Sequence, residues 1–171
     1  MTTIEEANAM SREEFVERFG GLYEHSSWIA EGAGRERPFG NLEDMRRAFE
    51  RAVEGASEER KLGLIRTHPD LAGKAAVAGE LTEESASEQT SAGLDRLSPE
   101  EFERFTRMNE EYRRKFEIPM VVCVREHTKE SILENAEARL ANSPEEEIRT
   151  ALGEIHKIAG LRLGDMIEGG K

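Results

Sequence analysis

The chain has 171 residues, of which 37% are hydrophobic and 35% charged, and its formal net charge is −12. This length is enough for one domain with a sizeable core. The acidic balance argues against nucleic acid and anionic membranes as partners, because phosphate groups are bound by clustered Lys and Arg. A small anionic substrate would therefore need a local cation.

The single cysteine, Cys123, excludes an internal disulfide and argues against a cysteine-based zinc site. The first residues do not resemble a signal peptide, and no apolar run reaches transmembrane length. These features predict a cytoplasmic protein.

Helix-start signals recur along the chain, each a Ser, Thr or Asn followed by acidic residues. Apolar residues spaced three and four apart follow them. We expect helices over about 12–19, 42–54, 58–67, 83–96, 99–116, 129–140 and 144–168, and a helical turn starting at Ser26 or Ser27. Trp28 is expected to anchor the core beneath that turn. Residues 70–80 are rich in Ala and Gly, which is typical of a small turn or helix followed by a loop.

Residues 118–124 break the helical pattern, because they are apolar throughout, rich in β-branched side chains and interrupted by Pro119. We predict one short extended segment there. About eight helical segments, no internal repeat and no long linker predict an all-α fold in a single domain over residues 1–171.

His68 lies directly before Pro69, and a residue before proline is pushed out of the α region, so a helix through Ile65 should end here. Imidazole can transfer protons near neutral pH, which makes His68 a candidate acid–base group. The alternative is a helix cap, where a cationic imidazole suits the helix dipole.

Glu88 shares a helix face with Ser85 and Gln89, at spacings that make the three side chains converge. This face lacks the Lys and Arg of a solvated surface. It is either a polar site or a surface with one exposed acid.

Arg162 lies on the apolar stripe Ile148, Leu152, Ile155, Ala159 and Met166. A buried guanidinium is costly unless it is paired or binds an anion, so Arg162 is an anion-binding candidate, a rim residue or half of an internal salt bridge. Asn109 lies on an aromatic stripe with Phe102, Phe105, Tyr112 and Phe116, and we interpret it as structural support.

The backbone of residues 120–124 needs hydrogen-bond partners if it is buried. Water, side chains or a planar polar ligand could supply them, unless the run is only an apolar connector. The histidines lack metal-binding spacing, and there is no phosphate-binding glycine loop or G-x-S-x-G motif. The remaining polar set suits a cofactor-independent reaction on a small anionic molecule, with arginine holding the anion and His and Glu moving protons.

Five separated motifs resemble those of the 2-oxo-4-hydroxy-4-carboxy-5-ureidoimidazoline (OHCU) decarboxylase family, and they follow the family's order. They are residues 19–28, 67–71, 85–94, the set Asn109, Tyr112, Lys115, Phe116, Pro119 and 121–125, and residues 154–163. Glu117, Ile118 and Met120 depart from the family pattern, but none of them is a polar group of the expected site.

The resemblance implies decarboxylation of OHCU to (S)-allantoin, the third step of urate degradation, by an all-α homodimer without metal or organic cofactor. It implies that His68 is the catalytic acid–base group and Glu88 its carboxylate partner. The substrate contacts it implies are Pro69, Ser85, Gln89, Met120, Val121, Val122, Cys123, Val124 and Arg162. Two alternatives are a lyase or hydrolase for a related ureide and a non-catalytic helical module that binds a partner.

Overall fold

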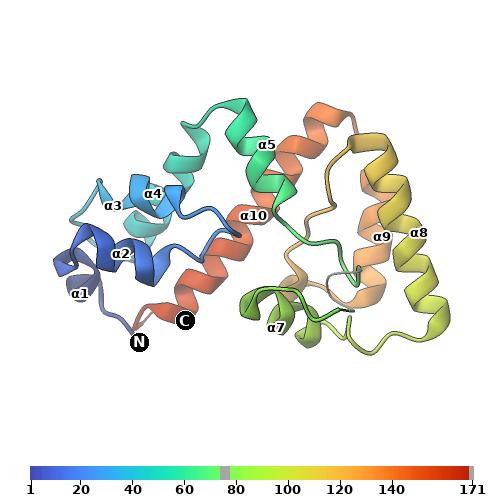
Figure 1. Cartoon of the computed structure of the whole chain (residues 1–171), viewed down its shortest axis with the longest axis horizontal. Helices are drawn as coiled ribbons and strands as arrows, with labels where there is room; N and C mark the ends of the chain where they lie inside the picture. Colours follow the sequence, from blue (N-terminus) through green and yellow to red (C-terminus); the bar gives the residue numbers. More distant parts are fainter. Residues whose placement is uncertain (74–77, 170–171) are drawn as a thin grey trace. The chain divides into compact units, whose positions relative to one another are not determined.

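The computed structural model describes residues 1–73 and 78–169, and its regular elements are helices joined by loops of varied length (Figure 1). The predicted all-α class is confirmed. The described residues form α1 (Ile4–Ala9), α2 (Arg12–Phe19), α3 (Trp28–Gly34), α4 (Leu42–Glu54), α5 (Glu58–Arg66), α7 (Glu83–Ser91), α8 (Pro99–Phe116), the 3-10 helix η1 (Val124–Glu126), α9 (Lys129–Arg139) and α10 (Pro144–Met166). The turn and loop expected over 70–80 lie partly outside the described residues.

The contacts group the chain into two compact units, one of Met1–Thr67 with Ile155–Lys171 and one of His68–Glu154. We call these unit 1 and unit 2. Helix α10 is continuous, with its residues up to Glu154 in unit 2 and the rest in unit 1. Most of the predicted site residues therefore belong to unit 2.

Unit 1 is built on α3, which packs against both α2 and α4. Its core holds an aromatic cluster in which the ring centroids of Phe15 and Phe19 lie 4.9 Å apart and those of Tyr23 and Phe49 lie 6.2 Å apart. A parallel bridge between Thr2 and Ile167 joins the start of the chain to the end of α10 (Figure 1).

Unit 2 contains α7, α8, α9 and the first part of α10, and α8 packs against α9. Its core combines side chains from these helices with the run that follows α8: Phe105, Tyr112, Ile118, Met120, Ile132, Ala136 and Ala151. The predicted extended segment therefore runs through the interior of unit 2.

Side-chain caps set most helix starts as the sequence predicts. Ser11 and Ser98 form reciprocal capping boxes with the third residue of their helices, and Asn41 accepts a hydrogen bond from the Asp44 N–H. The same signal opens α1, where Thr3 pairs with Glu6. Helix α1 was not among the predicted helices, and the described residues hold nine α-helices rather than about eight.

Helix α7 ends at Ser91, five residues before the predicted end, because Gly93 has a φ of +80°. The N–H of Leu94 donates to the Gln89 carbonyl and that of Gly93 donates to the Thr90 carbonyl, which is the Schellman pattern. The helix predicted over 83–96 is therefore five residues too long.

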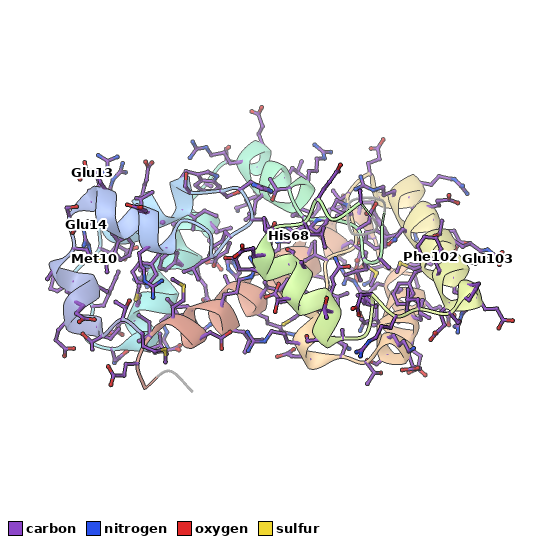
Figure 2. The ribbon with its side chains drawn as sticks, turned by 60° about the horizontal axis from the view of Figure 1, so that its bottom comes forward. Met10, Glu13, Glu14, His68, Phe102 and Glu103 are labelled. Carbon is purple, nitrogen blue, oxygen red and sulfur yellow. The ribbon has the colours of Figure 1, made fainter. Side chains whose placement is uncertain are left out.

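Several predicted core positions are also wrong. Trp28 is only half-buried and stacks under the Arg60 guanidinium, 4.6 Å from the ring centroid. Phe102 is 42% exposed (Figure 2). In α10 the predicted Ile155 and Ala159 are buried, as are Glu147, Ala151 and Glu154, whereas the predicted Ile148, Leu152 and Met166 are half-buried. A carboxylate can be buried where hydrogen-bond donors contact it, as described below for Glu147.

Residues 118–123 have neither helix nor strand, as predicted, but Val124 begins η1, so the extended segment is one residue shorter than expected. No helix among the described residues is both long and apolar enough to cross a membrane.

Candidate active site

His68 follows the end of α5 and is buried, with 7% of its surface exposed (Figure 2). The C-cap of α5 is Thr67, whose hydroxyl donates to the carbonyls of Leu64 at 2.6 Å and Glu24 at 3.0 Å. The helix therefore ends where the sequence predicts, but Thr67 takes the capping position. An acid–base role for His68 stays a prediction.

Two carboxamides fix the turn that follows His68 and Pro69. Gln89 accepts a hydrogen bond from the Ala72 N–H at 3.0 Å, and its amide N–H donates to the Asp70 carbonyl at 3.4 Å. Asn109 donates to the Leu71 carbonyl at 2.9 Å, which agrees with its predicted supporting role. Ala72 has a φ of +52°, an unusual value for a residue with a side chain. These bonds hold a turn that the backbone alone would not favour.

The buried face of α7 is polar. Ser85 and Gln89 are buried and Glu88 is half-buried, whereas Ala86 is exposed. Helix α7 packs against η1, so this polar face belongs to the same unit as residues 120–124. Burial of uncharged polar groups beside one carboxylate is the arrangement that a small polar ligand requires.

The predicted contacts Met120, Val121, Val122, Cys123 and Val124 are all buried. The Val121 carbonyl accepts a hydrogen bond from Arg139 Nη1 at 2.7 Å, and the Cys123 N–H points to Glu154 Oε1 at 3.5 Å. No hydrogen bond to the Val122 N–H is formed within the part of the chain that the structure describes. A buried N–H without a protein partner is unusual and suits a ligand acceptor.

Arg162, the predicted substrate cation, belongs to unit 1. It is 6% exposed, and its guanidinium donates to Glu24 Oε1 at 3.0 Å and to the Leu22 carbonyl at 3.3 Å. The internal salt bridge that the sequence left open therefore exists. A role in binding substrate is additional to this ion pair and stays a prediction.

A second buried ion pair, between Arg139 and Glu147, has no signal in the sequence. Arg139 Nε donates to Glu147 Oε1 at 2.8 Å, and the Tyr112 hydroxyl donates to the same oxygen at 2.5 Å. Burial, followed by this bond to Glu147, raises the pKa of Tyr112. Arg139 occupies the last turn of its helix, where a basic residue is common, so its burial could not be anticipated.

A cavity of about 360 Å³ lies beside α7, and Ala72, Gln89 and the exposed Phe102 line it. It shares Ala72 and Gln89 with the candidate site, but His68, Ser85 and Glu88 do not line it. Among the described residues, no three His, Cys, Asp or Glu side chains gather in a way that could hold a metal ion.

The chain is similar to known proteins in both sequence and structure. Residues 8–164 match the sequence model of the OHCU decarboxylase family. A protein of Haloferax volcanii named 2-oxo-4-hydroxy-4-carboxy-5-ureidoimidazoline decarboxylase is 44% identical over 163 residues, which cover 95% of each chain. The uric acid degradation bifunctional protein PucL of Bacillus subtilis is 38% identical over 98% of this chain and 33% of its own length.

Among solved structures, a crystal structure of (S)-allantoin synthase superimposes with a TM-score of 0.78 and 28% identity. The match covers 98% of this chain, and the chain spans 55% of the length of that protein.

Proposed function

This chain belongs to the OHCU decarboxylase family, and we propose that it converts OHCU to (S)-allantoin and CO2 in urate degradation. The observation that carries this proposal is the family match over residues 8–164. The buried polar face of α7, with His68 and the run 120–124 in the same unit, supports it from the structure.

The chemistry requires no electron sink beyond the substrate. When CO2 leaves, the electrons of the broken C–C bond remain on the former carboxyl-bearing carbon, and the adjacent C=N of OHCU accepts them. The protein must align the carboxylate with this π system, stabilise the developing charge and deliver a proton to one face.

In this proposal His68 transfers the proton and Glu88 is its carboxylate partner. Pro69 and Ser85 contact the substrate, together with the backbone of 120–124. Gln89 contacts the substrate from the same face and also holds the turn at Ala72 that follows His68. Arg162 binds an anionic group of the substrate in addition to Glu24. Each of these roles is testable by substitution.

The deciding experiment generates OHCU in place from urate, with urate oxidase and the hydrolase that follows it, and records circular dichroism over minutes. Wild-type protein should produce the (S)-allantoin signal far faster than the racemic background. His68→Gln should lose roughly 100- to 10,000-fold in rate, the usual contribution of a general acid–base group. A noncognate ureide in the same assay tests for a related lyase or hydrolase.

The melting temperature of His68→Gln separates this function from that of a partner-binding module. An unchanged melting temperature with at least a hundredfold rate loss excludes the module. Wild-type rates in His68→Gln would instead exclude His68 as the acid–base group.

The proposal also includes a homodimer, a cytoplasmic location and one folding domain over residues 1–171. The continuity of α10, which contributes residues to both units, supports the single domain. Sedimentation equilibrium tests the dimer, cell fractionation tests the location, and a single urea transition by two optical probes tests the domain.

A further inference from the structure

We propose that Arg139 is a positioning residue for the proposed decarboxylation, acting through the Val121 carbonyl to aim the Val122 N–H at an oxygen of the substrate. The inference rests on the proposed function of the site. It starts from the Arg139–Glu147 pair, whose side chains are 5% and 0% exposed.

The groups around this pair satisfy one another almost completely. Glu147 Oε1 accepts from Arg139 and Tyr112, and Glu147 Oε2 accepts from Asn142 Nδ2 at 2.8 Å. Arg139 Nη2 also lies 3.4 Å from the Tyr112 hydroxyl. The pair contributes little net stability in itself, because its desolvation offsets the attraction. What it does provide is a guanidinium with a fixed direction.

The one backbone group that this guanidinium binds is the Val121 carbonyl, at 2.7 Å. A trans peptide holds its carbonyl and the following N–H in opposite directions. Anchoring the carbonyl toward Arg139 therefore turns the Val122 N–H away from it. Glu154 lies near the next N–H, that of Cys123, so two side chains from α9 and α10 fix successive peptide groups.

This arrangement leaves the Val122 N–H available. Val122 is 3% exposed, and within the described residues its N–H forms no hydrogen bond. The segment leads directly into η1, against which α7 packs. A preoriented N–H in a buried setting binds a carboxylate or carbonyl oxygen without the cost of reorganisation.

The first test compares Arg139→Lys with Ile132→Val, a buried control on the same helix that has no polar contact. Lysine keeps a positive charge beside Glu147, but it lacks the planar guanidinium that donates to Glu147 and to the Val121 carbonyl at the same time. We expect Arg139→Lys to raise KM for OHCU so that kcat/KM falls about 100-fold, as misplacement of a binding group does. Ile132→Val should leave KM unchanged even at equal loss of melting temperature.

A second variant removes the N–H itself, through replacement of Val122 by its α-hydroxy acid. This change leaves every side chain in place and tests the inference even if Arg139→Lys does not fold. A raised KM supports the inference. A wild-type KM in this ester variant, or parallel losses in Arg139→Lys and Ile132→Val, overturns it.

If wild-type protein does not decarboxylate OHCU, the proposed function fails, and the positioning of the backbone is then read by NMR. The amide resonance of Val122 should shift or broaden in Arg139→Lys and keep its wild-type position in Ile132→Val. An unchanged Val122 resonance in Arg139→Lys refutes the positioning role independently of activity.

Discussion

Gln89 accepts a hydrogen bond from the backbone N–H of Ala72 at 3.0 Å, across 17 residues of sequence. Ala72 has a left-handed conformation, which costs about 1–2 kcal/mol for a residue with a Cβ atom. The bond therefore connects the polar face of α7 to a strained turn four residues after His68. Strain of this kind persists only where the surroundings hold it, and it is often found at functional sites.

Gln89→Leu should lower the free energy of unfolding by about 1–3 kcal/mol, because the buried Ala72 N–H loses its acceptor. Urea denaturation measures this change. Gln89→Glu is the matched control, since a carboxylate still accepts from Ala72 but cannot donate to the Asp70 carbonyl. The free energy of unfolding of Gln89→Glu should lie between those of the wild type and Gln89→Leu. Equal stabilities for the two variants would contradict the assignment of the Ala72 bond.

Ala72→Gly should raise the free energy of unfolding by up to about 1 kcal/mol. Glycine removes the left-handed strain, and this gain exceeds the extra chain entropy of about 0.4–1 kcal/mol that glycine brings to the unfolded state. Decarboxylase activity should stay within about twofold, because Gln89 and Asn109 still hold the turn. A clear loss of stability would show that the Ala72 methyl group packs in a way that outweighs its strain.

The sequence predicted most helix starts because caps are local. Ser11, Asn41 and Ser98 each bond within three residues of themselves, so their signal needs no tertiary information. The predicted end of α7 was wrong because Gly93 fits both a small helix face and a left-handed cap. Only the backbone conformation distinguishes these two roles. The predicted burial of Trp28 and Phe102 was wrong because the presence of a large apolar residue in the sequence does not reveal how much of its surface the fold covers.

The candidate site likewise combines features that the local sequence predicts with features that only the tertiary structure shows. The convergence of Ser85, Glu88 and Gln89 followed from helical spacing, and the end of α5 at Thr67 followed from Pro69. Arg139 could not be found in this way, because its partners Tyr112, Val121 and Glu147 come from three other segments. Only the assembled unit shows that this arginine is buried and that its guanidinium meets the Val121 carbonyl.

The free energy of unfolding should rise with pH through the range just below 6.5, in part because of His156. Burial lowers the pKa of His156 from its ordinary value of 6.5, and its Nδ1 lies 2.9 Å from the Tyr23 hydroxyl. Between the lowered pKa and 6.5 the unfolded state binds more protons than the folded state, so the stability is lost as pH falls and is complete above 6.5. Urea titrations from pH 5 to 8 measure this slope.

His156→Gln should flatten this part of the pH profile. Tyr23→Phe is the control, because it removes the hydroxyl but leaves the burial that is the main cause of the lowered pKa. We expect Tyr23→Phe to be less stable at every pH, with its slope retained. A slope that disappears in Tyr23→Phe would make the hydrogen bond the cause instead.

Arg162 should affect stability through Glu24 and activity through the substrate, and a double substitution separates the two effects. Arg162→Met removes the ion pair that Arg162 forms with the Glu24 carboxylate, which is 2% exposed, and this should cost about 3–5 kcal/mol. Adding Glu24→Gln removes the buried charge and should restore most of the lost free energy of unfolding. If Arg162 also holds the substrate, kcat/KM for OHCU stays low in the double variant although its melting temperature recovers. Recovery of both quantities together would show that Arg162 serves only the ion pair, and the anion-binding group of the proposed site would then have to be sought among other residues.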